Sequence, residues 1–568
     1  MSNFSKHKLL IAILLICLGS FIQSLSIIKS GINYSYGIGF WGANAHDGLW
    51  HVSLINQLSK LTLAHPTFSG YTITNYHYGF DLIAAILHKI SHIPILTLYF
   101  QILPVFTSLI IGILTYKLTR TLSWDQLASI WAVFFTYFGG SFGFIVGLLK
   151  GEGINRESAF WSIQSASYLV NPPFTLSVIF LLTGLICLLN FLKNKSKRFL
   201  VFSILLFGSV ILVKVYAGLI VLSSLFVVGA IKIAKEKDVR IFSIFLMSSA
   251  ISVALFLLTN KDASGLVKFE PLWFPRTMIE FKDRVGWEKL ANARQVYMAT
   301  KNYLKWIPAE LLGVCIFIVG NLGTRIIGLK TIFSYLKTKK IDTDHSKETI
   351  YLLLAALTIF SIVPTLLFVQ KGNPWNIIQF FYYAQIFLGL MAGLAVSKIR
   401  LSLALVIIII TLPTTLGSLQ NYLPQRPPAA ITQYEFKALE FLRLQPQGIV
   451  LTYPYNRDKF NQFHEPRPVY AYESTAYVSA ISNHQTFLED EMNLEISAYP
   501  WEQRREKVES FFKNSDNNAT SKFLKDNHIS YIYLLEGQDL AFGPEQTGLV
   551  QIYDNPHKVR IFHFSGNI

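Results

Sequence analysis

Apolar runs close to 20 residues long recur through the first three quarters of this 568-residue chain, and they limit its fold more than any other feature. A helix needs about 20 apolar residues to cross a hydrocarbon layer about 30 Å thick. The composition agrees, because 52% of the residues are hydrophobic and only 15% are charged, against roughly 25% charged in soluble domains. The sequence therefore excludes a soluble globular enzyme and predicts a polytopic α-helical membrane protein.

The apolar runs predict about eleven membrane spans. They lie at about 9–28, 95–116, 127–148, 174–192, 199–213, 217–231, 241–259, 307–324, 349–369, 378–397 and 401–418. The stretch 80–93 is also apolar, but it is short and contains His88 and Lys89. We expect it to form an interfacial or re-entrant helix rather than a span.

Basic side chains in the short connections predict the orientation, because Lys and Arg accumulate on the cytoplasmic side of a membrane. With eleven crossings and a cytoplasmic N-terminus, the basic clusters from Lys117 to Lys398, including the segment from Arg325 to Lys347, all face the cytoplasm. This topology predicts a multi-pass protein of the cell (plasma) membrane. Residues 1–420 would form its transmembrane domain, with a long first outer loop at 29–94 and another outer loop at 260–306.

The composition changes at Asn421, and the proline-rich segment Pro424–Pro428 cannot continue a helix. Residues 425–568 are expected to form a separate extracytoplasmic α/β domain. The pattern predicts helices at 432–445 and near 501–513, strands at 448–455 and 529–535, and a hairpin around Asn555.

The net charge of +16 does not indicate nucleic-acid binding. From Arg426 onward there are 14 basic and 18 acidic residues, so the basic excess belongs entirely to the membrane part of the chain. In that part, basic residues orient the chain in the membrane and contact anionic lipid headgroups. The sequence has no stripe of basic residues interleaved with aromatic residues, which nucleic-acid binding would favour. Membrane lipids are therefore expected partners, and nucleic acid is not.

The first outer loop carries the best cluster of titratable residues. Its segment AHDGLWH contains His46, Asp47 and His51, and its segment NYHYGFD contains His77 and Asp81. If 76–92 is helical, His77 and Asp81 point from one face, because they are four residues apart. The group would then supply a general base, or Asp47, His77 and Asp81 would hold a divalent metal. The alternative is structural: Asp47 would cap a helix, and the histidines would be wetted interfacial residues.

Basic residues on the predicted outer side form a second group. Lys214 separates two apolar runs, Arg276 follows FEPLWFP, and Lys371 shares the loop QKGNPWN with Trp375. Cations near aromatic residues at the headgroup level suit a lipid phosphate or pyrophosphate. Snorkelling to the interface or ion pairing between helices would explain the same residues.

Patterns typical of other enzyme classes do not occur in the sequence. There is no GxxxxGK[ST], HExxH or CxxC motif, which argues against an ATP-driven pump and a zincin. A reaction without a nucleotide is therefore favoured.

The layout resembles the GT-C superfamily of integral membrane glycosyltransferases, such as the protein O-mannosyltransferases and the aminoarabinose transferases of lipid A. The resemblance rests on the first span, the long outer loop with the acid of AHDGLWH, helices parallel to the membrane, about eleven to thirteen spans and an outer C-terminal domain. It implies transfer of a sugar from a polyprenyl-phosphate-linked donor to a lipid, glycan or protein acceptor on the outer face.

The resemblance also implies that Asp47 is the base, or orients the acceptor. His46 stands beside it where many relatives have a second acid, which leaves metal dependence open. We assign catalytic roles to Asp47, His46 and Asp81. The expected substrate-binding residues are His51, His77, Lys214, Arg276, Lys371 and Trp375. A transporter or flippase of lipid-linked glycans and a non-enzymatic membrane assembly factor or receptor are the alternatives; a transporter would need ionisable groups along midplane helices and paired repeats.

Overall fold

The structure is a computed structural model, and it describes residues 3–261, 267–338, 345–556 and 559–566. The chain divides into two compact units. The first, which we call the helical unit, comprises Met1–Ser26 and Pro104–Leu423. The second, the α/β unit, comprises Ile27–Leu103 and Pro424–Ile568. The first outer loop, which the sequence assigned to the transmembrane domain, therefore lies in the same unit as residues 425–568.

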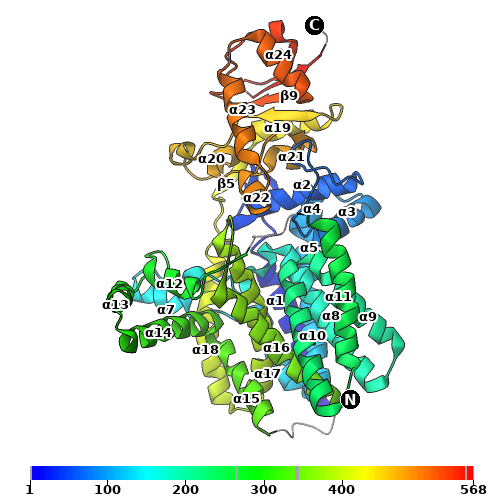
Figure 1. Cartoon of the computed structure of the whole chain (residues 1–568), viewed down its shortest axis with the longest axis vertical. Coiled ribbons are helices and arrows are strands. Elements are labelled where there is room, and N and C mark those ends of the chain that lie inside the picture. Colours follow the sequence, from blue (N-terminus) through cyan, green and yellow to red (C-terminus); the bar gives the residue numbers. More distant parts are fainter. Residues whose placement is uncertain (1–2, 262–266, 339–344, 557–558, 567–568) are drawn as a thin grey trace. The chain divides into compact units, whose positions relative to one another are not determined.

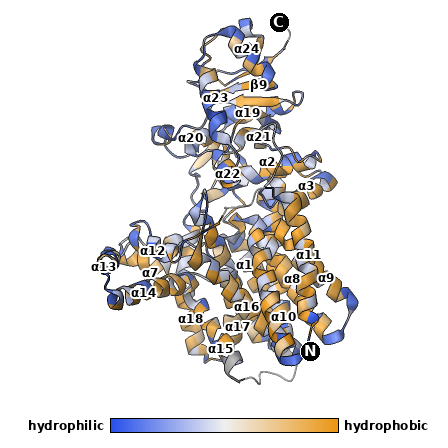
Figure 2. Ribbon diagram, in the orientation of Figure 1, coloured by the Kyte–Doolittle hydropathy of each residue, from blue (hydrophilic) through white to orange (hydrophobic). Residues whose placement is uncertain are grey.

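Long apolar helices build the helical unit (Figure 1). They are α1 (Asn3–Ser24), α5 (Leu103–Ser123), α6 (Gln126–Phe138), α8 (Pro172–Asn194), α9 (Lys197–Val213), α10 (Val215–Glu236), α11 (Arg240–Thr259), α14 (Tyr303–Leu322), α15 (Gly328–Thr338), α16 (His345–Leu367), α17 (Gln379–Val396) and α18 (Leu401–Leu419). Shorter elements lie between them: α7 (Gly143–Leu149), η3 (Glu157–Phe160), η4 (Ser165–Val170), β3 (Val267–Phe269), α12 (Trp273–Glu280), α13 (Glu288–Ala299), η5 (Gly323–Ile327), β4 (Phe368–Gln370) and η6 (Pro374–Ile378). Figure 2 shows that apolar residues dominate the long helices.

Within the described ranges, nine helices are long and apolar enough to cross a membrane, or ten if the pair α6 and α7 forms one span. These helices confirm a polytopic membrane protein, with fewer spans than the eleven expected. The predicted span at 199–213 is α9, whose 17 residues reach only about 26 Å at 1.5 Å per residue. The predicted span at 127–148 is broken, because α6 and α7 are bent by 48°.

The segment 80–93 forms α3 (Gly79–Ser91), a helix of 13 residues. At 1.5 Å per residue it is about 20 Å long, which is too short to cross the hydrocarbon layer. It belongs to the α/β unit.

Arg325 is not in a loop of the predicted cytoplasmic cluster. The expected span at 307–324 continues through η5, so that Tyr303–Tyr335 is one apolar segment, and Arg325 within it has an exposed fraction of 0%. Its guanidinium donates to the carbonyl oxygens of Leu322 and Asn321 and to the Oη of Tyr168. The buried cation therefore has several acceptors, which reduces the cost of removing it from water.

Helix α17 is the most deeply buried long helix, with 94% of its apolar window inside the structure. It packs against α6 and α16. Gly393 makes the close approach to α6 possible, because a Cβ at this position would lie 2.4 Å from the backbone nitrogen of Ala132. Small residues allow helix backbones to approach closely in membranes.

Two sheets build the α/β unit. The four-stranded sheet has the order β1-β2-β5-β7, in which β1 (Asn33–Tyr34) and β2 (Gly37–Phe40) come from the first loop and β5 (Ala429–Thr432) and β7 (Arg467–Pro468) from the C-terminal part. Ile38 pairs with Ile431 in an antiparallel register, and both residues are buried. The loop is thus an integral part of this unit.

The five-stranded sheet has the order β10-β11-β9-β6-β8. Its strands are β6 (Ile449–Thr452), β8 (Gln485–Thr486), β9 (Ile529–Leu534), β10 (Leu549–Asp554) and β11 (Arg560–Phe564). Strand β6 pairs in parallel with β8 and β9, and β9, β11 and β10 are antiparallel. The predicted strands at 448–455 and 529–535 and the terminal hairpin are confirmed.

Helices complete the α/β unit. They are η1 (Gly42–Ala45), α2 (Asp47–Ser59), α3, α4 (Ile95–Thr97), η2 (Leu98–Ile102), α19 (Gln433–Arg443), η7 (Arg457–Gln462), α20 (Val469–Tyr472), α21 (Tyr477–Ser482), α22 (Glu491–Ile496), α23 (Trp501–Lys513), α24 (Asn517–Asp526) and η8 (Glu545–Thr547). Helix α19 begins with a capping box formed by Thr432 and Glu435. The predicted helices at 432–445 and 501–513 are therefore confirmed as α19 and α23.

The close approach at Gly393 gives a test of helix packing. A Gly393→Ala substitution should destabilise the protein by about 1–3 kcal/mol, because the backbone of α6 cannot move aside as a side chain would. Gly389→Ala in the same helix is the control, since its Cβ would meet atoms no closer than 3.4 Å. Thermal unfolding in detergent should show a lower midpoint for Gly393→Ala alone, and equal midpoints for the two variants would contradict the packing.

Candidate functional site

Asp47 is the first residue of α2, and it is the exposed member of an otherwise buried segment. Residues Gly48–Leu58 of this helix are all buried, whereas the Asp47 side chain is 52% exposed. The helix cap is His46 rather than Asp47, and the His46 side chain makes no capping hydrogen bond. Asp47 is therefore positioned by a rigid helix start but remains accessible to a substrate.

His46 joins Asp47 to a residue far along the chain. Its Nδ1 lies 2.9 Å from Asp47 Oδ1, and its Nε2 lies 3.1 Å from Asp490 Oδ1. Asp490 is fully buried, caps α22 and receives a hydrogen bond from Asn493 Nδ2 at 2.8 Å. One imidazole thus bridges an exposed carboxylate and a buried one.

The electrostatics of this bridge favour a charged His46. Burial alone would lower the pKa of His46, but the two carboxylates of Asp490 and Asp47 hold it well above its usual range. As an imidazolium, His46 donates both ring N–H groups and fixes the orientation of Asp47. Asp47 can then orient an acceptor group or accept its proton.

The second predicted pair also forms, but it is buried. His51 Nδ1 lies 2.8 Å from Asp81 Oδ1, and the Asp81 side chain has an exposed fraction of 0%. The His51 ring stacks on Tyr99 with 5.7 Å between ring centroids. Asp81 is therefore placed to orient His51, which lies one helical turn after Asp47 on α2.

His77 is not on the same helix as Asp81. Helix α3 begins at Gly79, so His77 precedes it, and its ring stacks on Tyr76. The expectation of a shared helix face was wrong because the helix starts three residues later than the pattern 76–92 indicated. The oxygen and nitrogen atoms of Asp47, His77 and Asp81 also do not form a compact group; within the described ranges, such a group occurs at Glu236, His345 and Glu348.

Lys214 lies at the break between α9 and α10. It is only 4% exposed, its Nζ lies 3.3 Å from Asn171 Oδ1, and it sits 5.6 Å from the centroid of the Tyr216 ring. Asn171 also caps α8 through the backbone nitrogen of Phe174. The Lys214 ammonium group therefore lies beside the residue that caps the start of α8.

The other basic candidates have different surroundings. Arg276 Nε lies 3.2 Å from Glu310 Oε1, so this guanidinium forms an ion pair inside the helical unit. Lys371 is exposed in the turn before η6. Trp375 stacks on Trp161 with 4.1 Å between ring centroids and contacts Trp273. The ion pair that sequence reasoning kept as an alternative is thus present at Arg276.

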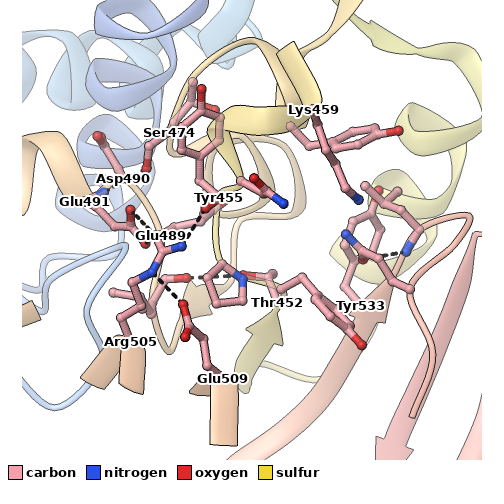
Figure 3. Close-up of a pocket in the computed structure, with 18 of the residues that line it drawn as sticks. Thr452, Tyr455, Lys459, Ser474, Glu489, Asp490, Glu491, Arg505, Glu509 and Tyr533 are labelled. Carbon is pink, nitrogen blue, oxygen red and sulfur yellow. Dashed lines mark hydrogen bonds and ion pairs between the residues drawn. The ribbon is translucent and has the colours of Figure 1, made fainter. Parts of the chain in front are cut away.

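The α/β unit contains a pocket beside Asp490 (Figure 3), with a volume of about 430 Å³. Its lining combines aromatic residues with acids and bases. Arg505 donates to Glu491 and Glu509, and its Nη2 donates to the carbonyl oxygen of Tyr455 at 2.8 Å. One wall is therefore a rigid ionic network.

Glu489 forms another part of this wall and holds the start of α21. Its carboxyl oxygens accept hydrogen bonds from the backbone nitrogens of Val478 and Ser479 at 2.8 and 3.0 Å. Burial is the main reason that the pKa of Glu489 rises to about 8. Helix α21 in turn accepts a hydrogen bond from Asn56 of α2 at the carbonyl oxygen of Ala480.

Sequence reasoning missed Asp490, Glu489 and the pocket. Their signal is the run Glu489-Asp490-Glu491 between apolar residues, which reads like an ordinary solvated charge run. Only the approach of this run to α2 reveals a role for Asp490.

The chain is similar to several solved structures. The archaeal oligosaccharyltransferase AglB from Archaeoglobus fulgidus, in complex with an inhibitory peptide and a dolichol-phosphate, matches with a TM-score of 0.50 and 12% identity over 94% of this chain and 70% of that one. A second structure of an oligosaccharyltransferase from this organism, tethered to an acceptor peptide, matches with the same TM-score and identity over 98% and 74% of the two chains. ArnT from Cupriavidus metallidurans bound to undecaprenyl phosphate is less similar, with a TM-score of 0.40 and 10% identity over 97% of each chain.

These comparisons place the chain in a fold class. No family model matches the sequence, and no curated protein matches it. The likeness to the oligosaccharyltransferases confirms the GT-C fold that the resemblance implied. At 12% identity it shows the fold alone.

Glu489 predicts a pH dependence of stability. The pKa of Glu489 is about 8 in the folded protein, above its value in the unfolded chain. Its contribution to the free energy of unfolding is therefore complete below about pH 4.3 and is lost as the pH rises to about 8. In the Glu489→Gln variant the side chain stays neutral at every pH, so the loss of stability between these pH values should be smaller by a few kcal/mol. The unfolding midpoint of the variant, measured between pH 5 and 9, should fall less steeply than that of the unchanged protein; parallel profiles would contradict the assignment.

Proposed function

We propose that this chain is a membrane glycosyltransferase that transfers a sugar from a polyprenyl-phosphate-linked donor to a lipid, glycan or protein acceptor. The carrying observation is the accessible carboxylate of Asp47, held by the buried His46 in a chain with the GT-C fold. The structural neighbour AglB was solved with a dolichol-phosphate, which agrees with a lipid-linked donor.

Two side chains have separate roles in the proposed reaction: the carboxylate of Asp47 acts on the acceptor, and the ammonium group of Lys214 acts on the leaving phosphate. Asp47 would orient the acceptor nucleophile and accept its proton while the nucleophile attacks the anomeric carbon. The bond from that carbon to the donor phosphate breaks, and the phosphate leaves with the electron pair. A cation stabilises this developing negative charge, and Lys214 is the buried ammonium group that we assign to this role. The reaction would take place on the outer face of the cell membrane.

The Asp47→Asn variant tests whether the carboxylate of Asp47 acts as the base. The amide keeps the size of the side chain but cannot accept a proton, so transfer should fall by about 10²- to 10⁴-fold. Purified protein in detergent or nanodiscs would be given polyprenyl-phosphate sugars, and labelled product would be measured. Asp526→Asn is the control, because Asp526 is exposed at the end of α24. Transfer that is unaffected by Asp47→Asn would overturn the proposal, and movement of lipid-linked sugar without transfer would indicate a transporter instead.

Lys214→Ala tests the cation. A charge-assisted contact to phosphate contributes about 1.5–3 kcal/mol, so the apparent KM for the donor should rise, or kcat should fall, by roughly 10- to 100-fold. Lys214→Arg should retain part of the activity, since the charge remains. Lys268→Ala is the matched control, because this lysine is 72% exposed in the same unit. An unchanged donor KM and kcat in Lys214→Ala would exclude this role for Lys214.

A further inference from the structure

The pocket of the α/β unit contains groups that the proposed reaction does not use. Its volume of about 430 Å³ lies in the range of roughly 300–1,000 Å³ found for small-molecule sites. The lining comes from the end of β6, from α20 and the segment after it, from the acidic run 489–491 and from α23 (Figure 3).

Aromatic side chains supply the apolar surface of this pocket. Tyr453, Tyr455 and Tyr470 line it and are each half-buried. The Tyr453 ring is fixed, because it stacks on Phe512 with 3.8 Å between ring centroids and its hydroxyl donates to the carbonyl oxygen of Asp539. A tyrosine offers an apolar face and a polar tip, which together match the C–H face and the hydroxyls of a sugar ring.

The charged side chains deepest in the lining have partners within the α/β unit. Arg505 lies between Glu491 and Glu509, as Figure 3 shows, and Asp490 contacts His46. Removing an ionic ligand from water requires an opposite charge at the site. Because Arg505, Glu491, Glu509 and Asp490 each already contact an opposite charge, we expect this wall to favour an uncharged ligand that accepts and donates hydrogen bonds.

Thr475 indicates a missing hydrogen-bond partner. It lines the pocket and is 4% exposed, and no hydrogen bond to its Oγ1 occurs among the described residues. A buried hydroxyl without a partner costs free energy. A rotation about χ1 would turn this buried Oγ1 toward the pocket, where a ligand hydroxyl would supply the partner.

We propose that this pocket binds a neutral saccharide, with a sugar ring on Tyr455 and a sugar hydroxyl on Thr475. Resting on the proposed function, we further assign this saccharide to the acceptor. The wall residue Asp490 contacts His46, which contacts Asp47. Two hydrogen bonds therefore connect the pocket to the proposed base, so the acceptor is a glycan or a glycosylated lipid.

Direct binding tests the saccharide without requiring any reaction. The full-length protein in detergent would be titrated with neutral trisaccharides of mannose, galactose and N-acetylglucosamine, with saturation-transfer NMR as the readout. A trimer of glucuronic acid, a trimer of glucosamine and a peptide containing Asn-X-Thr test the other charges and a peptide ligand. We expect at least one neutral trisaccharide to bind, and the charged sugars and the peptide not to compete with it.

Variants connect this binding to the pocket. Tyr455→Ala should weaken it about tenfold by removing the stacking face, whereas Tyr455→Phe should change it little. Thr475→Val keeps the side-chain shape and should weaken binding several-fold by removing the hydroxyl. Tyr434→Ala on α19 is the control, because Tyr434 is 43% exposed and lies outside the pocket lining. Thermal unfolding would verify that each variant is folded.

The outcomes separate this inference from the proposed function. No binding of any neutral trisaccharide, binding insensitive to Tyr455→Ala and Thr475→Val, or binding of the peptide instead would overturn the saccharide pocket, even if Asp47-dependent transfer occurs. If the saccharide binds but no transfer depends on Asp47, the proposed function fails and the pocket remains. If both hold, the pocket variants should raise the acceptor KM and leave the donor KM unchanged, and an unchanged acceptor KM would remove the acceptor assignment.

Discussion

The bridge formed by His46 between Asp47 and Asp490 is the interaction on which the arrangement of the site depends. It joins residues 444 positions apart in the sequence, so it fastens the first loop to the C-terminal part of the chain. Breaking a buried ion pair by removing one member leaves an uncompensated charge. The same contact therefore keeps the buried charge of Asp490 compensated, orients the proposed base and lies at one wall of the pocket.

A different constraint acts on the helical unit: hydrocarbon cannot solvate polar groups, so the protein must supply their partners. Its buried cations lie where the chain itself supplies acceptors: Arg325 among backbone carbonyls and a tyrosine hydroxyl, and Lys214 beside the amide of Asn171. Arg276 is instead paired with Glu310. In these contacts the cations are satisfied by carbonyl, amide and hydroxyl oxygens at Arg325 and Lys214, and by a carboxylate at Arg276.

Sequence reasoning located part of the site, and the reasons for success and failure are physical. Asp47 and His46 are adjacent, so their proximity required no knowledge of the fold. His77 was expected to share a helix face with Asp81, but α3 begins only at Gly79, and such boundaries depend on packing that a local pattern does not contain. Asp490 was missed because an acidic run in sequence looks the same whether it is solvated or buried against another segment.

The order of residues along the chain was enough to predict repeated membrane-spanning helices, a mixed helix and strand region after them, and an acid beside a histidine in the first loop. Hydrophobic length and strand alternation are local properties, so neighbouring residues suffice to reveal them. The pairing of β2 with β5, the contact of His46 with Asp490 and the pocket beside Asp490 became visible in the folded chain. These features require contacts between segments hundreds of residues apart, and no local pattern specifies which distant partners meet.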